Sequence, residues 1–382
     1  MKISDIAEVI NETEKEPSKS GIDVFVGLEH YDIAEPVIKR FGGTQMLSTA
    51  AKVFKKGDVL IARRNVYLQR AAMAPFSGLT SGDSIVLRVK EKLDTEETDH
   101  DTISKLLPFI LNSVDFWDYA NTNADGTMSK RLSPALLLDY EFDLPPIEEQ
   151  KLRAEKLWAA YEVKQSYLKM IKATQEMVQS QFIEMFYNET HPVQQLTSHI
   201  EVLRGVSYKP SDVQEAATSS NSTILRSNNI YNGQINYDDV VFVDSDRVSD
   251  YQVVSEGDIV LCGSNGSKSL VGKAALIDST PLHRTSFGAF CLGIRCKNTV
   301  LPKYLATYFQ TSLYRNVIES LGSGSNILNI KPEHIYNLEI PIPTIEEQQR
   351  FVLVAEQADK SEFELKKSIE AIDAVIKSLI NS

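Results

Sequence analysis

An internal repeat with an offset of about 200 residues constrains this 382-residue chain more than any other feature. The segment 145–150, Pro-Pro-Ile-Glu-Glu-Gln, returns at 343–348 as Pro-Thr-Ile-Glu-Glu-Gln. Upstream of it, the run 54–60 resembles 254–260, with Gly-Asp at the same place in each. A period this long indicates two similar globular blocks rather than a solenoid of short units. The chain is therefore predicted to be a tandem duplication.

Each copy of the repeated motif opens a long segment without Pro or Gly. Mostly apolar side chains recur there at alternating spacings of three and four, which predicts two long helices with coiled-coil seams. The seams are Ala154, Leu157, Tyr161, Lys164, Leu168, Ile171, Gln175, Val178, Phe182 and Met185, and Phe351, Ala355, Ala358, Glu362, Leu365, Ile369, Ile372, Ile376 and Leu379. We expect the two helices to pair antiparallel; the alternative is that each packs only on its own block.

The globular blocks mix short β-rich runs with modest helices. Strands are predicted at 58–62, 84–89, 240–243, 258–262 and 290–294, and helices near 104–120 and 302–320. The predicted fold class is therefore mixed α/β, with two tandem globular domains separated by two long helices that form an antiparallel coiled coil. The predicted parts are 1–145 for the first domain, 146–187 for the central helix, 188–340 for the second domain and 341–382 for the C-terminal helix.

The charge balance argues at first against a nucleic-acid partner. The formal net charge is −12, whereas a chain that binds nucleic acid by itself usually has a broad basic face. The local pattern differs, because the stretch 52–90 contains eight Lys and Arg residues and only two Asp. The stretch 259–277 contains Lys268 and Lys273 and no acidic residue.

The polar loops differ between the two blocks although the framework is repeated. Arg63–Arg70 follows the strand of the first block, and Gly263–Ser269 follows the matching strand of the second. Further polar loops lie at 123–131 and 322–326. Such side chains can contact phosphates and base edges, although each loop taken alone is better explained as ordinary surface. Arg88, at the end of a strand, is expected to be solvated.

Motifs for catalysis or cofactor binding are missing. The run Gly266 to Lys273 is one residue too long for a phosphate-binding P-loop, and Ala274 stands where Ser or Thr is needed. The six His are scattered, and the three Cys lack ligand spacing and are expected to be buried free thiols. We expect neither a secretory signal nor a membrane-spanning segment. These features predict a binding protein without catalytic activity of its own.

Several segments together resemble the specificity subunit of type I restriction-modification enzymes. They are the run 57–89, the two block ends 139–150 and 337–348, the two long helices, and the segments 257–278 and 322–330 of the second block. The resemblance implies two target recognition domains, each of which reads one half of a bipartite target in double-stranded DNA. It implies that the helix pair sets the unread spacer and docks two modification subunits, the methyltransferases of the complex.

The resemblance also implies where the chemistry lies. S-adenosylmethionine would bind to the modification subunits, and ATP and Mg²⁺ to restriction subunits where these are present, so no cofactor or metal is expected in this cytoplasmic, non-catalytic chain. The residues that would contact DNA are Arg63, Arg64, Arg70, Lys130 and Arg131 in the first block and Arg204, Tyr208, Lys209, Ser264, Asn265, Lys268, Lys273, Ser323, Ser325 and Asn326 in the second.

Two other interpretations remain open. The same fold could serve as the DNA-recognition subunit of another DNA-modification or phage-defence complex. Alternatively, the chain could be a coiled-coil adaptor that joins two protein-binding blocks, which the negative net charge favours and the diverged polar loops oppose.

Overall fold

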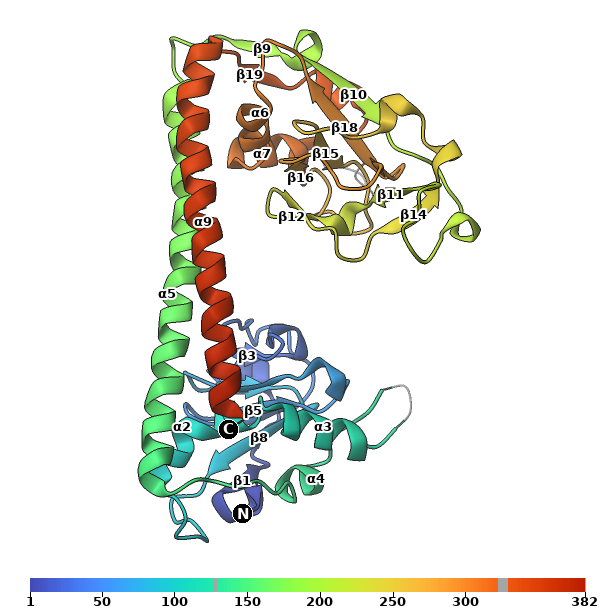
Figure 1. Cartoon of the computed structure of the whole chain (residues 1–382). Helices are drawn as coiled ribbons and strands as arrows, with labels where there is room; N and C mark the ends of the chain where they lie inside the picture. Colours follow the sequence, from blue (N-terminus) through green and yellow to red (C-terminus); the bar gives the residue numbers. More distant parts are fainter. Residues whose placement is uncertain (127–128, 322–328, 382) are drawn as a thin grey trace. The chain divides into compact units, whose positions relative to one another are not determined.

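The computed structural model describes residues 1–126, 129–321 and 329–381, and it divides into two compact units. One unit comprises Met1–Leu168 with Lys366–Ser382, and the other comprises Lys169–Leu365. Each unit contains one globular block together with a part of both long helices, α5 (Ile147–Phe186) and α9 (Ile345–Ile380) (Figure 1).

The first block is built on an antiparallel four-stranded sheet with the order β1-β8-β5-β6 and a smaller sheet with the order β2-β4-β7-β3. Three helices follow the last strand before α5 begins. The elements are α1 (Ile3–Ile6), β1 (Ala7–Ile10), β2 (Thr13–Glu14), β3 (Phe25–Val26), β4 (Ala51–Phe54), β5 (Val59–Ala62), β6 (Ala71–Met73), β7 (Gly78–Thr80), β8 (Ser84–Val89), α2 (His100–Ile110), α3 (Val114–Asn123) and α4 (Pro134–Leu138).

The second block repeats the topology of the larger sheet. Its four-stranded antiparallel sheet has the order β10-β18-β15-β16, and its smaller sheet has the order β14-β11-β17. The elements are β9 (Val193–Gln195), β10 (Ile200–Arg204), β11 (Asn221–Leu225), β12 (Ile230–Tyr231), β13 (Gln234–Ile235), β14 (Val241–Asp244), β15 (Ile259–Cys262), β16 (Ala274–Leu276), β17 (Thr285–Phe287), β18 (Cys291–Cys296), α6 (Pro302–Tyr308), α7 (Ser312–Leu321), α8 (Pro332–Tyr336) and β19 (Glu339–Pro341).

The central strand of each block is buried on both faces. Val59 and Ile61 of β5 pack with side chains of the helices, whereas Leu60 and Ala62 pack into a second cluster that includes Phe54. Alternate side chains of a strand point to opposite faces, so an uninterrupted apolar run fits a strand covered on both sides. β15 divides its four residues between two cores in the same way.

The repeated Gln of the motif forms the same clamp in both blocks. Gln150 Nε2 donates to the carbonyl oxygens of Pro145 and Glu97, at 2.8 and 2.7 Å. Gln348 Nε2 donates to those of Pro343 and Thr299, both at 3.0 Å. Both side chains are fully buried. The motif therefore fastens the start of each long helix to its own block.

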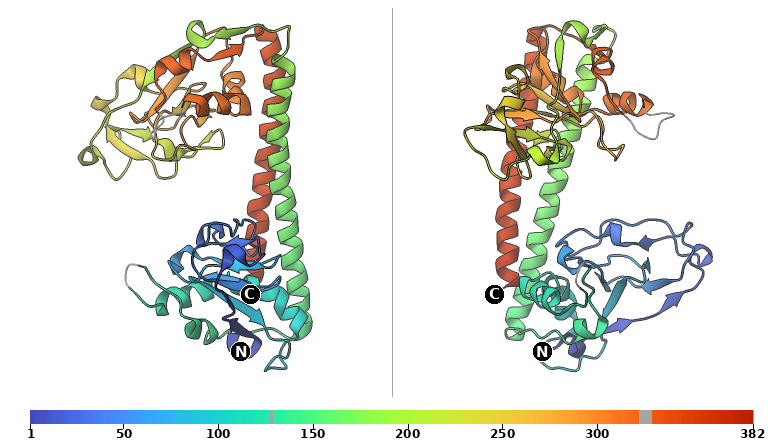
Figure 2. Two further views of the ribbon diagram at one scale, coloured as in Figure 1. Left: turned by 180° about the vertical axis from the view of Figure 1, so that it is seen from behind. Right: turned by 90° about the vertical axis from the view of Figure 1, so that its right-hand side faces the viewer.

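The two long helices pair antiparallel, as the seams predict, and the two helices lie side by side in both views of Figure 2. In the first unit Lys164 Nζ lies 2.6 Å from Asp373 Oδ1. In the second, Gln175 Nε2 donates to Glu362 Oε2 at 2.9 Å, and Phe182 packs against Phe351. All predicted seam positions are at least partly buried except Leu168, which is 40% exposed. The helices also pack on the blocks, so the alternative describes only part of their contacts.

The single helices predicted near 104–120 and 302–320 were wrong in one respect, because each is two helices. Ser113 caps a new helix by accepting the N–H of Phe116 through its side chain, which separates α2 from α3. Thr311 Oγ1 similarly accepts the N–H of Tyr314 at the start of α7. Such side-chain caps end one helix and begin the next even where the apolar pattern continues.

Candidate nucleic-acid interface

The loop after the central strand meets the segment before the last short helix in both blocks. In the first block, Arg63 O accepts the N–H of Leu132 at 2.9 Å, and Arg64 pairs with Arg131 in an isolated bridge. In the second block, Gly263 O accepts the N–H of Ile330 at 2.8 Å. There, Ser264 pairs with Asn329. The fold therefore builds two equivalent polar surfaces whose exposed side chains differ.

Asp83 is the centre of the surface in the first block. Its Oδ2 lies 2.9 Å from Arg64 Nε, and its Oδ1 accepts from Arg131 Nη2 at 3.0 Å. The two guanidinium side chains are half exposed, whereas the Asp83 side chain is 27% exposed. The arrangement presents two cations to solvent above one carboxylate.

Three further cations lie beneath or beside this pair. Arg63 Nε donates to Leu132 O, and Arg70 donates to the carbonyl oxygens of Leu28 and Arg64. Burial, together with the charge of Arg63, lowers the pKa of Lys52, and burial lowers that of Arg70. Burial is the main cause of both shifts, and Arg63 lies close enough to Lys52 to add to the first. The cluster therefore has a local positive potential, in spite of the negative charge of the whole chain.

The loop that carries these arginines has an unusual backbone. Asn65 and Gln69 have φ values of 55° and 48°, in the left-handed region, on either side of a short 3₁₀ turn. The turn presents Tyr67, which is 61% exposed. Non-glycine residues in this conformation cost energy and persist where the surroundings hold them. Lys130, by contrast, is turned toward α3, because its Nζ donates to Asn121 O.

The surface in the second block contains a pocket next to Asn265. The pocket is lined by residues that include Tyr208, Arg226, Asn228 and Phe290. Asn265 Nδ2 donates to the hydroxyl of Ser227, another lining residue, at 2.8 Å. Burial raises the pKa of Tyr208, so its hydroxyl stays protonated and able to donate. The predicted Tyr208, Ser264 and Asn265 are thus brought together.

Arg204 lies at an adjoining pocket, whose lining includes Ser207, Asn329 and Lys331. Its side chain has no carboxylate partner within the described ranges of the chain. The exposed Lys209 follows Tyr208 in the sequence.

Lys268 and Lys273 lie in the turn that faces α7. Arg315 of that helix donates to the carbonyl oxygens of Val271 and Lys268, at 2.7 and 3.4 Å. Neither lysine is among the residues that line the Tyr208 pocket. The predicted Ser323, Ser325 and Asn326 lie outside the described residues.

Sequence reasoning missed five residues of these surfaces: Lys52, Tyr67, Asp83, Arg226 and Phe290. An acidic residue within a basic cluster gave no signal of its own, and Arg226 and Phe290 lie outside the loops that the repeat singles out. The αL positions of Asn65 and Gln69 could not be recognised from residue type alone, because Gln has no preference for that region.

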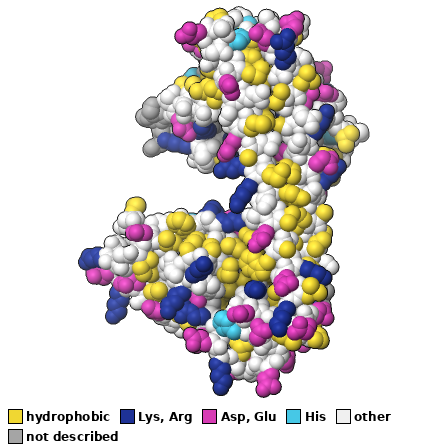
Figure 3. Space-filling view, turned by 90° about the vertical axis from the view of Figure 1, so that its left-hand side faces the viewer, with side chains coloured by type: hydrophobic (Ala, Val, Ile, Leu, Met, Phe, Trp, Pro, Cys, Tyr) yellow, Lys and Arg dark blue, Asp and Glu magenta, His cyan; other side chains and the backbone are white. Residues whose placement is uncertain are grey.

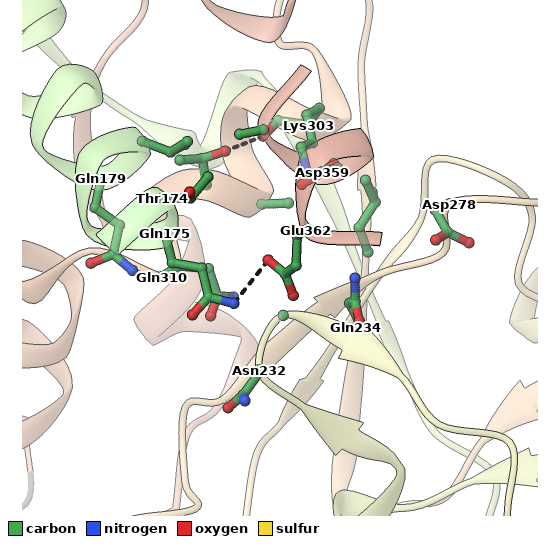
Figure 4. A pocket seen from close by; sticks show the side chains of 16 residues that line it. Thr174, Gln175, Gln179, Asn232, Gln234, Asp278, Lys303, Gln310, Asp359 and Glu362 are labelled. Carbon is green, nitrogen blue, oxygen red and sulfur yellow. Dashed lines mark hydrogen bonds and ion pairs between the residues drawn. The ribbon is translucent and has the colours of Figure 1, made fainter. Parts of the chain in front are cut away.

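A further pocket in the second unit does not involve any of the residues predicted to contact DNA. It lies between the helices and the sheet region, and amide and carboxyl side chains such as Gln175, Glu362 and Asp278 line it (Figure 4). In the described part of the chain, no three His, Cys, Asp or Glu side chains are grouped so as to hold a metal ion. No described helix is long and apolar enough to span a membrane.

Comparison with known proteins identifies the region that carries the second surface. Residues 206–373 match the family described as the type I restriction modification DNA specificity domain. The matched residues include Tyr208, Ser264, Asn265 and Asn329, and the match extends into α9.

Two curated relatives are named as specificity subunits of type I restriction enzymes. The chain is 41% identical over 170 residues to the type I restriction enzyme StySPI specificity subunit of Salmonella potsdam. It is 39% identical over 168 residues to the EcoKI specificity subunit of Escherichia coli K12. Each match covers 44% of this chain, but only 35% and 34% of those relatives. The predicted resemblance to type I specificity subunits is confirmed, and the chain spans about a third of the length of these relatives.

Two solved structures share the fold along the whole chain. One, from work on complex assembly and conformational transition of the type I R-M system, gives a TM-score of 0.54 at 16% identity and covers 100% of this chain and 96% of that one. The other, the type I restriction-modification S subunit from M. genitalium, gives 0.52 at 13% identity and covers 100% and 94%. The predicted mixed α/β fold class, with two domains and long helices, is confirmed.

Proposed function

We propose that this chain is the DNA sequence-specificity subunit of a type I restriction-modification complex. The observation that carries the proposal is the pair of equivalent surfaces: the same framework positions Arg64 and Arg131 in one block and Ser264 and Asn329 in the other. Two surfaces that share a backbone arrangement but differ in their exposed side chains suit a DNA target with two unlike halves. The DNA specificity domain at residues 206–373 supports the same conclusion.

The residue types fit contacts with a duplex. The free guanidinium donors of Arg64 and Arg131 can bind phosphate or the O6 and N7 acceptors of guanine, whereas the hydroxyl and amide groups of Ser264 and Asn265 can contact phosphates and base edges. The negative net charge opposes a broad basic face, but two small surfaces suffice where partner subunits hold the duplex as well.

The helix pair would provide the spacer and the docking site for two modification subunits. Met170 and Met177 are about half exposed on the part of α5 in the second unit and lie seven residues apart, so they share one face of the helix. Hydrophobic side chains are visible at the surface of the helices in Figure 3. An exposed apolar stripe of this kind is typical of a protein–protein interface.

The chemistry would lie on the partners. S-adenosylmethionine and adenine methylation belong in this proposal to the modification subunits, and ATP-driven translocation and cleavage to restriction subunits. The chain itself would contribute no catalytic residue and would work in the cytoplasm. The second version of the proposal is a complex without restriction subunits. In it, too, each block would recognise one half of the DNA target.

The test is DNA binding by the full chain purified with its modification subunits. We expect binding to random duplex to weaken steeply as salt rises, and Arg64→Ala to cost about 1–3 kcal/mol and relax one position of one half-site. Lys90→Ala is the matched control, because Lys90 pairs with Asp94 beyond the far end of β8 from Asp83. The assignment of the first block fails if Arg63→Ala and Arg64→Ala both leave affinity, salt dependence and selected sequence unchanged.

A further inference from the structure

The backbone of Asp83, the residue at the centre of the first surface, is anchored by two hydrogen bonds. Asp83 O accepts the N–H of Arg63 at 2.8 Å, and its own N–H donates to Ser81 Oγ at 3.2 Å. The next residue, Ser84, begins β8, whose paired strands fix the position of the loop. The loop that carries the Asp83 carboxylate is therefore anchored to the sheet, and Arg64 and Arg131 both pair with that carboxylate.

The two arginines reach this point from distant parts of the chain and use different oxygens. Arg64 uses its Nε and Arg131 uses Nη2, so each guanidinium keeps further N–H donors for a ligand. Both side chains are more exposed than the carboxylate between them. A single carboxylate thus orients two guanidinium groups that face the solvent.

The charge at this site is excessive for a purely structural ion pair. Lys52, Arg63 and Arg70 lie around Arg64 and Arg131. Among the described residues, Asp83 is the only acidic side chain that forms an ion pair with Arg64 or Arg131. An excess of cations around one anchor suits a polyanion that also offers acceptor groups in a fixed pattern, which is the chemistry of a DNA groove.

We infer that Asp83 is a specificity-determining positioning residue: it aligns Arg64 and Arg131 so that they discriminate between base edges instead of binding any phosphate. This inference rests on the proposed function. The inference assigns two opposite effects to Asp83. Its carboxylate repels the phosphate backbone, which weakens binding to any duplex, but it also orients Arg64 and Arg131, which improves discrimination between base edges.

Asp83→Asn tests this directly. The amide has the shape of the carboxylate but loses the charge, so we expect the affinity for a random-sequence duplex to rise and the slope of log K against log salt to steepen by about 0.9. At the same time, the preference for the selected target over random duplex should fall by about tenfold, which is the loss of one good base contact. A purely structural role would weaken both kinds of binding together and lower the urea midpoint.

Two variants complete the experiment. Asp83→Glu keeps the charge but displaces both oxygens by one methylene, so it should keep the random-duplex affinity of the wild type and lose discrimination. Asp94→Asn removes the same charge from an exposed pair beyond the other end of β8 and should change neither quantity. All proteins are the full chain purified with its modification subunits, and the probes are a randomised duplex library and one fixed random duplex.

The outcomes separate the inference from the function on which it rests. If the wild type enriches no sequence from the library, the proposed function fails and the inference fails with it. If the wild type enriches a sequence but Asp83→Asn or Asp83→Glu discriminates as well as the wild type, or Asp83→Asn loses both kinds of binding in parallel, only the role of Asp83 is overturned.

Discussion

Arg88 and Asp58 form a two-pronged ion pair that bridges neighbouring strands of the first block. Arg88 Nε and Nη2 each donate to one Asp58 oxygen at 2.7 Å, and Asp58 is only 2% exposed. The second block contains the same pair, Arg295 on Asp258, at 2.9 and 2.7 Å. The expectation that Arg88 is merely solvated was wrong. The Gly-Asp of the repeat thus forms a turn, and the Asp carboxylate in that turn binds an arginine on the neighbouring strand of the central sheet.

Removal of one member of this pair should destabilise the first block. Asp58→Ala leaves the Arg88 guanidinium without its partner and should lower the free energy of unfolding by about 3 kcal/mol, measured by urea denaturation. Asp94→Ala is the control, since its pair with Lys90 is exposed and such pairs contribute about 1 kcal/mol or less. Equal effects of the two substitutions would contradict the structural role of Asp58.

The two buried glutamines should differ in their contribution to stability. Gln348 also accepts the N–H of Leu301 at 2.8 Å, whereas Gln150 Oε1 has no hydrogen-bond partner among the described residues. Gln348→Leu therefore removes three hydrogen bonds to backbone groups, whereas Gln150→Leu removes only two. With about 1 kcal/mol for each bond, we expect losses of about 3 and about 2 kcal/mol in urea denaturation. The reverse order would show that the clamp acts through something other than these bonds.

The stability of the second block should depend on pH through His199. Burial, together with the nearby charge of Lys297, lowers the pKa of His199 from its ordinary value of 6.5. A base whose pKa is lower in the folded state resists protonation there, so the stability it provides is present above pH 6.5 and is lost as the pH falls below that value. We expect the free energy of unfolding to decrease from pH 7.5 to pH 5, and less steeply in His199→Gln. Parallel curves would rule out His199 as the source.

The exposed stripe on α5 should be needed for assembly but not for folding. Met170→Glu with Met177→Glu places two charges on that face, which an apolar interface cannot accommodate without a large desolvation penalty. The double variant should lose co-purification with the modification subunits while its urea midpoint stays that of the wild type. Lys169→Gln with Lys172→Gln, on the same helix, changes the net charge by the same two units and is the control. Assembly that survives the Met substitutions would place the partner elsewhere.

The sequence predicted the architecture well because the repeat and the seams record backbone periodicity directly. Strand 84–89 was predicted with its observed ends, and Glu362 was assigned to the seam although it is charged. What could not be predicted depends on contacts between distant residues. Nothing in the local sequence indicates that Asp83 lies between Arg64 and Arg131, or that Asn265 lies beside Ser227. Those relationships appear only when the sheets bring separate loops together.

The central claim is that two differently equipped surfaces of one chain specify two halves of one DNA target. Mapping of methylated adenines across the genome, in cells with this chain, without it, and with Arg64→Ala and Arg131→Ala together, tests it most directly. We predict a bipartite motif that disappears without the chain and that becomes degenerate in one half only when the two arginines are replaced. A methylation pattern that is the same in all three strains would contradict the claim.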